Sequence, residues 1–276
     1  MLPQLERDYY EPFLGGGSTF FHLSRSEIRP FRSFLGDSNL QLMKVYSAIK
    51  LDPEGVIDAV TSMAAAYKAA TDKRAFYERE REFFNDGLPK CDPARFIFLN
   101  ATCWNGLWRT NSSGRFNVPY GAPRGDDVMP TPTTIRNVSA ALQSAELRTS
   151  SWRNVINTAG SGDFVFLDPP YFSDIAQNGT KYGAESWGET EHLNLAQALL
   201  RLHDKGSRFL LTNSGEVQME MMYRDLGLSV HRVLVARAIS SKPDERKPVG
   251  ELVVTNPDVR RSQVPGLAEL ELLALD

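Results

Sequence analysis

Cysteine is scarce in this 276-residue chain, and its two cysteines are too few for a disulfide scaffold or a cysteine-based zinc site. The four histidines are scattered without the spacing of metal ligands, so we expect no metal site. No apolar run approaches the roughly 18 residues that a membrane helix needs, and the start MLPQLERDYY lacks the charged and apolar regions of a signal peptide. These absences predict a soluble, cytoplasmic protein with no membrane partner.

An excess of positive charge is also absent. Lys and Arg number 31 against 34 Asp and Glu, which gives a net charge of −3. This balance excludes a uniformly basic protein but not a local basic surface that binds nucleic acid. Hydrophobic residues make up 42% and charged residues 24%, which is ordinary for a globular protein and excludes a disordered chain. The length predicts one large domain or two smaller ones.

Patterns of alternating strand and helix occur at both ends of the chain. A short strand near residues 8–11 leads through glycines into a helix, and a second strand at 33–37 precedes a helix up to about residue 49. Residues 163–167 form a continuous apolar run, which is typical of a buried central strand. A helix at 191–202, a strand at 208–212 and an antiparallel edge pair at 229–237 and 251–255 follow. This order predicts an α/β fold.

The middle of the chain has a different composition. Asp52-Pro53-Glu54 is a strong helix start, and residues 71–84 predict a second, heavily charged helix. Residues 85–150 are rich in Asn, Gly, Pro, Thr and Arg, which indicates loops. We therefore expect a discontinuous α/β domain at 1–50 and 151–260, an inserted helical and loop-rich domain at 51–150, and a tail at 261–276.

A glycine-rich turn follows the first strand, in the motif Glu11-Pro12-Phe13-Leu14-Gly15-Gly16-Gly17. Glycines between a strand and a helix let the backbone approach a ligand, and the helix start offers free N–H groups. Asp37 ends the next strand, where a carboxylate can accept both hydroxyls of a ribose. Many such turns bind nothing, and this one lacks the G-x-G-x-x-G spacing of dinucleotide folds. By itself the turn is a weak signal.

A second motif, Asp168-Pro169-Pro170-Tyr171, stands directly after the apolar strand. Two prolines cannot continue a strand ladder, so the strand stops and the backbone that follows is held rigid. The Asp168 carboxylate and the Pro169 carbonyl then project from the carboxyl end of the strand, where open α/β sheets bind ligands. Two acceptors aimed at one point suit an amino group, and the Tyr171 ring suits a planar heterocycle.

With these two motifs, the sequence resembles the Dam-type (D12 class) DNA adenine-N6 methyltransferases. The similarity covers roughly residues 9–255 in order and spacing. The matching stretches are EPFLGGG at 11–17, Asp37 with Asn39, NGLWRTNSSGRFNVPYG at 105–121, GDFVFLDPPY at 162–171, Asn213-Ser214, and a last group from Ser240-Ser241 through Arg246 to Glu251-Leu252.

The resemblance implies a Rossmann-like S-adenosylmethionine-dependent methyltransferase sheet and an enzyme that methylates adenine N6 in DNA. It assigns cofactor binding to Glu11, Pro12, Phe13, Gly15, Gly17, Asp37 and Asp168, and catalysis to Asp168, Pro169, Pro170 and Tyr171. In that assignment Asp168 and the Pro169 carbonyl accept hydrogen bonds from the adenine amino group, and Tyr171 stacks on the extruded base.

The resemblance also makes the inserted domain a target-recognition region for double-stranded DNA, with a GATC-like site. The implied DNA-binding residues are Trp104, Asn105, Leu107, Arg109, Asn117 and Pro119, and Arg109 is our candidate for a bidentate contact with guanine. Residues 101–155 carry six arginines against three acids, and residues 231–261 carry seven Lys and Arg against four acids. This local positive charge suits phosphate groups.

Two departures from the family pattern concern cofactor binding. The opening segment of the type Lys-Trp-Ala-Gly-Gly-Lys is absent, and Ser151-Trp152 stands where Asp-Phe is expected. They motivate an alternative hypothesis, in which a degenerate methyltransferase with weak or absent cofactor binding acts as a DNA-binding or regulatory subunit. A weaker alternative is methylation of RNA or of cytosine N4. The exact site, the oligomeric state and pairing with a nuclease in restriction–modification are left open, and the intact Asp168–Tyr171 motif favours the enzyme.

Overall fold

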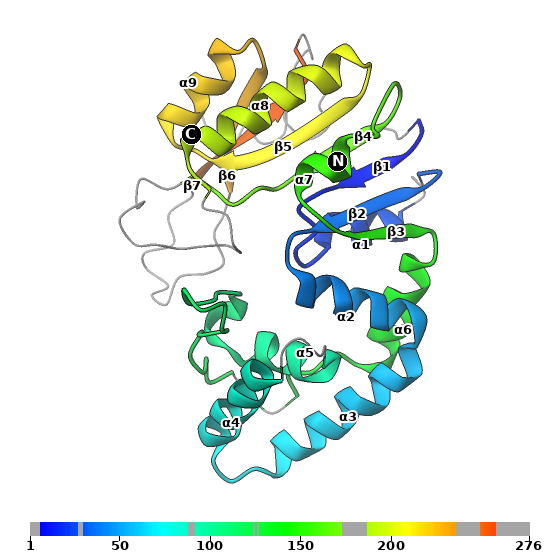
Figure 1. Ribbon diagram of the computed structural model, residues 1–276, viewed down its shortest axis with the longest axis vertical. Coiled ribbons are helices and arrows are strands. Elements are labelled where there is room, and N and C mark those ends of the chain that lie inside the picture. Colours follow the sequence, from blue (N-terminus) through cyan, green and yellow to red (C-terminus); the bar gives the residue numbers. More distant parts are fainter. Residues whose placement is uncertain are drawn as a thin grey trace. The chain divides into compact units, whose positions relative to one another are not determined.

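The computed structural model describes residues 6–26, 30–87, 92–123, 125, 127–172, 187–235 and 249–257. The elements, labelled in Figure 1, are β1 (Tyr9–Glu11), α1 (Ser18–Arg25), β2 (Ser33–Asp37), α2 (Leu40–Leu51), α3 (Pro53–Ala69), α4 (Lys73–Asp86), α5 (Pro93–Thr102), η1 (Trp104–Gly106), α6 (Pro132–Leu142), β3 (Ala145–Thr149), α7 (Trp152–Ile156), β4 (Phe164–Leu167), α8 (Glu189–Asp204), β5 (Arg208–Ser214), α9 (Val217–Asp225), β6 (Ser229–Val235) and β7 (Val249–Thr255). The predicted tail at 261–276 lies outside the described residues, as do Ser240, Ser241 and Arg246.

The described strands form one sheet in the order β3-β2-β1-β4-β5-β7-β6. Strand β1 pairs in parallel with β2 and β4, and β4 pairs in parallel with β5. Strand β7 runs antiparallel to both β5 and β6, which confirms the expected antiparallel pair near the end of the chain. Strands β2 and β3 are added on one side of β1, whereas β4 and the later strands are added on its other side. The strand order therefore reverses between β1 and β4. Ligands of open α/β sheets bind at such a point.

The core around β4 and β5 follows from the apolar runs in the sequence. Phe164, Val165 and Leu167 of β4 are buried, as a central parallel strand requires. Helix α8 packs against β5 (Figure 1) and contributes its apolar face, which includes Leu195 and Leu199, to the same hydrophobic cluster. These contacts fix the carboxyl ends of β4 and β5, where the second motif begins.

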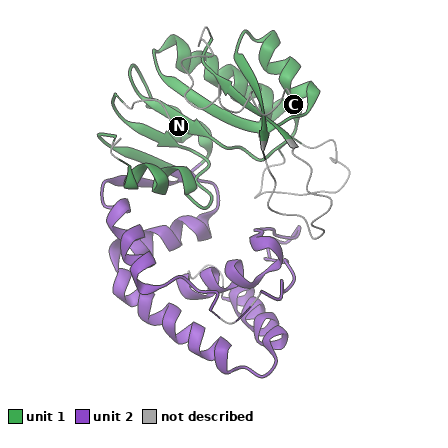
Figure 2. Ribbon diagram, turned by 180° about the vertical axis from the view of Figure 1, so that it is seen from behind, with its two compact units in different colours: residues 1–35, 151–179, 187–276 green, residues 36–150, 180–186 purple. Residues whose placement is uncertain are grey.

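The chain divides into two compact units (Figure 2). Unit 1 comprises residues 1–35, 151–179 and 187–276, and unit 2 comprises residues 36–150 and 180–186. The expected functional domains, with boundaries at residues 50 and 150, stay a prediction, because the units are defined by packing alone. Helix α2 falls in unit 2, since it packs against α3, α5, α6 and β3.

Unit 2 is more helical than its composition indicates. Helices α3, α5 and α6 each begin with a side-chain cap followed by proline, namely Asp52-Pro53, Asp92-Pro93 and Thr131-Pro132. A capping oxygen satisfies a free N–H group of the first turn, and proline needs no partner there. The inserted region is helical as well as loop-rich, as expected, and residues 85–150 contain α5, α6 and β3, whose positions the composition did not indicate. Among the described residues, no helix is both long and apolar enough to cross a bilayer.

Candidate active site and nucleic-acid interface

The two motifs meet at the point where the strand order reverses. Glu11 is the last residue of β1, and Asp168 directly follows β4, which pairs with β1 in parallel. Burial is the main cause of the raised pKa of Glu11, and the nearby Asp168 charge adds to it, so the two carboxyl groups lie close together. The sheet therefore brings the predicted cofactor turn and the predicted catalytic segment to one edge.

The glycine turn between β1 and α1 has an open backbone. Gly15 and Gly17 adopt left-handed conformations with φ of 47° and 66°, and the Gly17 N–H donates to the Leu14 carbonyl at 2.7 Å. A Cβ atom added to Gly15 or Gly16 would meet no atom within 4 Å. A ligand can thus approach this backbone closely, and side chains at φ near +60° would be strained.

The buried side chain of Glu11 supports the start of α1, directly after the glycine turn. Glu11 is only 2% exposed, and its carboxylate accepts hydrogen bonds from the Tyr9 hydroxyl at 2.7 Å and from the backbone N–H of Phe20. Phe20 lies in the first turn of α1, whose N-cap, Gly17, has no side chain to offer. Glu11 therefore supplies the missing cap. Burial raises its pKa to about 8, so it is largely protonated at neutral pH.

Aromatic side chains border the turn. The Phe13 ring lies 5.2 Å from the Trp187 ring and 6.5 Å from the Trp152 ring, measured between centroids, and Pro12 before it is buried. Ser151, which replaces the expected Asp, caps α7 by accepting from the Arg153 N–H at 3.4 Å. Serine and aspartate are both good N-caps, so this substitution keeps the local helix start.

Asp37 ends β2, which runs parallel to β1, so it lies at the same edge of the sheet as the turn. It is buried, and one carboxylate oxygen accepts from the Asn39 N–H at 2.8 Å. An open glycine turn, a carboxylate on the neighbouring strand end and the Phe13 ring together fit a nucleoside cofactor. The individual roles of these residues stay predictions.

The predicted catalytic segment is held by Thr212, a residue that no motif in the sequence indicates. The Thr212 hydroxyl, on β5, donates to Asp168 Oδ1 at 2.6 Å. Asp168 itself is exposed, but neighbouring protein atoms displace enough water to raise the pKa of its carboxyl group, and the Thr212 bond partly opposes this. Pro169 is buried and Pro170 is half-buried, so the prolines anchor the segment while Asp168 reaches the surface.

The Tyr171 side chain is half-buried and oriented by β7. Its hydroxyl donates to Glu251 Oε2 at 3.3 Å, and burial raises its pKa above the ordinary value of a tyrosine. Trp187 is half-buried as well, and its ring packs on the rings of Phe13 and His192.

In unit 2, residues 103–121 form a hairpin that carries all the predicted DNA-binding residues. Its two arms are joined by bridges between Cys103 and Tyr120 and between Thr110 and Phe116. Backbone hydrogen bonds link the Trp104 N–H to the Pro119 carbonyl at 2.9 Å and the Asn117 N–H to the Arg109 carbonyl at 3.1 Å. The structure therefore brings these residues together on one short element.

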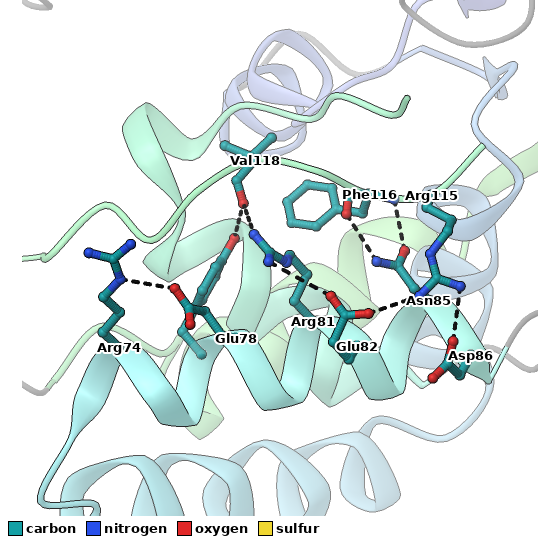
Figure 3. Close-up of polar contacts among 10 residues, drawn as sticks. Arg74, Glu78, Arg81, Glu82, Asn85, Asp86, Arg115, Phe116 and Val118 are labelled. Carbon is teal, nitrogen blue, oxygen red and sulfur yellow. Dashed lines mark hydrogen bonds and ion pairs between the residues drawn. The ribbon is translucent and has the colours of Figure 1, made fainter. Parts of the chain in front are cut away.

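Helix α4 holds the hairpin through backbone atoms (Figure 3). Asn85 donates to the Phe116 carbonyl at 3.0 Å and accepts from the Phe116 N–H at 2.8 Å. The Tyr77 hydroxyl donates to the Val118 carbonyl at 2.7 Å. At the hairpin tip, the Arg115 guanidinium pairs with two acids of α4. These contacts fix the backbone and leave other hairpin side chains open to solvent.

Most of the residues that the resemblance predicts to meet DNA are open to solvent. Trp104 is 49% exposed and Leu107 is 51% exposed, so two large apolar side chains of the hairpin face solvent. Asn105 and Pro119 are exposed as well, and Asn105 adopts a left-handed conformation with φ of 54°. Half-buried Asn117 lies on the facing arm.

Arg109 differs from the other arginines of this region. Its Nε donates to Asn117 Oδ1 at 3.0 Å, and no carboxylate pairs with it among the described residues. The other described arginines of residues 101–155 all pair with acids, namely Arg115, Arg136, Arg148 and Arg153. Among the described arginines of this segment, Arg109 is therefore the one whose positive charge is not paired with a carboxylate.

The fold and the site define a class of protein. The sheet order, with the glycine turn and the Asp-Pro-Pro-Tyr segment at its point of reversal, is the Rossmann-like arrangement of S-adenosylmethionine-dependent methyltransferases. The family model described as D12 class N6 adenine-specific DNA methyltransferase matches residues 1–239, and the chain belongs to this family.

Curated relatives agree with this assignment. The chain is 30% identical over 260 residues to the type II methyltransferase M.MjaIII of Methanocaldococcus jannaschii, covering 91% of this chain and 88% of that protein. It is 32% identical over 254 residues to the DNA N-6-adenine-methyltransferase of Escherichia phage P1, covering 89% and 31%, and 29% identical over 248 residues to the DNA adenine methylase of Escherichia coli K12, covering 88% and 84%. The protein is therefore an S-adenosylmethionine-dependent DNA adenine-N6 methyltransferase, and these matches do not favour the degenerate alternative.

Proposed function

We propose that the protein methylates an adenine rotated out of double-stranded DNA at a GATC-like site, with Asp168 and the Pro169 carbonyl gripping the amino group. The observation that supports this most is the placement of Asp168 at the carboxyl end of β4, beside the cofactor turn and reaching the surface. Both reacting partners would meet at the one edge of the sheet where α/β proteins bind ligands.

The chemistry explains why two acceptors are needed. The lone pair of the adenine amino nitrogen is delocalised into the purine, so the nitrogen is a poor nucleophile. Hydrogen bonds to Asp168 Oδ2 and the Pro169 carbonyl favour a tetrahedral nitrogen and localise the lone pair. Bound S-adenosylmethionine supplies an electrophilic methyl group on sulfur.

Methyl transfer forms one bond, breaks another and releases a proton. The nitrogen forms a bond to the methyl carbon, the electron pair of the carbon–sulfur bond stays on sulfur, and the nitrogen releases one proton. As the proposed acceptor of the amino group, Asp168 Oδ2 would take this proton and pass it to water, and the raised pKa of Asp168 suits it to this role.

The aromatic and apolar groups support extrusion of the base. Rotating a base out of a duplex costs a few kcal/mol, and stacking on an aromatic ring recovers part of this. Tyr171, tied by its hydroxyl to Glu251, has an oriented ring for such stacking. Trp104 and Leu107 would contact the duplex, since apolar side chains commonly fill the space between separated bases.

Arg109 would read a guanine. Its Nε is occupied by Asn117, which orients the guanidinium plane and leaves both terminal nitrogens to donate to O6 and N7. The GATC-like site rests on the resemblance of residues 105–121 to the recognition segment of Dam-type enzymes. Pro119, on the facing arm, would lie beside the same bases.

The test measures methyl transfer from labelled cofactor to duplexes that contain GATC, single-base variants of it, or single strands, with nucleoside analysis of the product. We expect N6-methyladenine in the GATC duplex, and a fluorescence increase when 2-aminopurine replaces the target adenine. Asp168→Ala should abolish transfer while calorimetry still detects the cofactor, and exposed Asp225→Ala serves as the matched control. Full activity of Asp168→Ala, or equal methylation of all duplexes, would contradict the proposal.

A further inference from the structure

Three consecutive residues at the end of β5 hold both ends of the Asp168–Tyr171 segment. At the start, Thr212 Oγ1 lies 2.6 Å from Asp168 Oδ1 and 3.4 Å from the Leu167 carbonyl. At the other end, Asn213 Oδ1 accepts from the Phe172 N–H at 3.3 Å, and the Ser214 hydroxyl donates to the Phe172 carbonyl at 2.8 Å. The reaction chemistry described above assigns no task to these residues.

We propose that Thr212 is a positioning residue for methyl transfer, whose hydroxyl occupies Asp168 Oδ1 and thereby reserves Oδ2 for the adenine amino group. This inference rests on the proposed role of Asp168. It goes further by naming the group that decides which carboxylate oxygen faces the substrate.

The geometry shows why a threonine suits this task. The terminal torsion of an aspartate is broad, so an unrestrained carboxylate presents either oxygen over a range of angles. Leu167 is opposite Leu211 in the β4–β5 register, which places Thr212 beside Asp168. The Thr212 hydroxyl also contacts the Tyr171 hydroxyl, but it has one proton, and the short 2.6 Å distance assigns that proton to Asp168 rather than to the Leu167 carbonyl at 3.4 Å.

The other end of the segment is fixed by a buried amide. Asn213 Nδ2 lies 3.2 Å from Nδ1 of His192 and 3.3 Å from the Tyr223 hydroxyl. Since the amide N–H donates to Nδ1, the neutral His192 ring carries its proton on Nε2. These contacts orient Asn213 so that its oxygen faces Phe172. The segment is thus restrained at both ends, and Thr212 acts on the reacting side chain itself.

Removing the Thr212 hydroxyl should change the titration of Asp168. The hydrogen bond favours the ionised carboxylate and lowers its pKa, in opposition to burial. Among the residues that the structure describes, the other titratable groups that interact with Asp168 are Glu11 from β1 and Tyr171 on its own segment, and Glu251 from β7 lies beyond Tyr171. None of them is a cation. Without Thr212 the pKa of Asp168 therefore rises further.

The experiment compares single-turnover methylation by the full chain in Thr212→Val, which keeps the shape without the hydroxyl, and in Thr212→Ser, which keeps the hydroxyl. In Thr212→Val we expect a rate about 10-fold to 100-fold lower, as for the loss of a hydrogen bond to a charged group, with cofactor affinity within about twofold. The acid limb of its pH–rate profile should move to higher pH. Thr212→Ser should recover the rate to within about threefold.

Thr255→Val is the matched control, because the Thr255 hydroxyl on neighbouring β7 is buried and has no partner among the described residues. Its rate and pH profile should equal those of the wild type. A Thr212→Val enzyme with the wild-type rate and profile, or a Thr212→Ser enzyme as slow as Thr212→Val, would overturn the inference. Should valine prevent folding, Thr212→Ala is compared with Thr212→Ser by the same criteria. Activity of Asp168→Ala would instead overturn the proposed function.

Discussion

Asn85 is expected to be the main anchor of the hairpin, and its replacement by alanine tests how α4 supports DNA reading. Asn85 is buried and makes two hydrogen bonds with the backbone of Phe116, at 2.8 and 3.0 Å. Its loss leaves a buried N–H and a buried carbonyl without partners. Each unsatisfied group costs about 1–3 kcal/mol, so we expect a local destabilisation of about 2–4 kcal/mol, since water can reach part of the gap.

Amide hydrogen exchange at Phe116 measures this locally, without requiring that the two units unfold together. Protection at this amide should fall in Asn85→Ala by about 30-fold or more, while amides of β4 stay unchanged. Affinity for duplex DNA should fall as well, because the exposed residues lose their fixed backbone. Glu78→Gln on the same helix is the control, since its ion pair with Arg74 is exposed and contributes little. Unchanged Phe116 protection in Asn85→Ala would refute the anchoring argument.

Three further predictions concern single residues. Arg109→Lys should lower discrimination between GATC and single-substituted sites by about 1–3 kcal/mol, because lysine cannot donate two parallel hydrogen bonds. Competition between GATC and single-substituted duplexes measures this discrimination, with Arg136→Lys as the control because Arg136 pairs with Glu54. Equal discrimination in the two variants would contradict the proposed contact of Arg109 with guanine. Burial raises the pKa of Glu11 from 4.5 to about 8, so the folded protein keeps a proton that the unfolded chain releases. The stability that this group contributes is complete below pH 4.5 and is lost as the pH rises toward 8. In Glu11→Gln, the free energy of unfolding measured in urea should therefore fall less over this pH range. An unchanged pH dependence in the variant would show that Glu11 ionises normally. Burial lowers the pKa of His192 from 6.5 to about 4, so the unfolded chain binds the extra proton and stability falls as the pH drops from 6.5 to 4. In His192→Asn the asparagine oxygen can replace Nδ1 as the acceptor, so the loss of stability between pH 6.5 and pH 4 should disappear. The same loss in the variant would show that another group causes it.

The sequence indicated the central strands well and the helices of unit 2 less well. Continuous apolar residues predicted β4 and β5, because a central parallel strand is buried on both faces. Asp52-Pro53 predicted the start of α3, and the same signal was present at Asp92-Pro93 and Thr131-Pro132. At these two positions the helix-start signal is hard to recognise, because the many Asn, Gly and Pro residues nearby indicate loops. In β3, Glu146 and Arg148 alternate with apolar positions over only five residues, which is too short for a clear pattern.

For the candidate site, the sequence located the motifs but not the contacts that orient them. The two prolines predicted that the strand ends at Asp168, since proline cannot continue a ladder. The role of Thr212 depends on the register between β4 and β5, which residue patterns do not reveal. Residue patterns also did not reveal that the Glu11 side chain turns inward and caps α1. This role arises because Gly17, the N-cap residue of α1, has no side chain that could accept a hydrogen bond.

The way α4 grips the hairpin has a consequence for how such an enzyme can acquire a new target sequence. The hydrogen bonds of Tyr77 and Asn85 to the hairpin go to main-chain atoms of residues 116 and 118. Every amino acid provides the carbonyl groups, and every amino acid except proline provides the N–H group. Substitutions at exposed positions such as Leu107 and Arg109 would leave those bonds in place. Helix α4 therefore supports the backbone that carries the side chains proposed to contact DNA, so selection could change those side chains, and the target sequence with them, while the supporting hydrogen bonds stay the same.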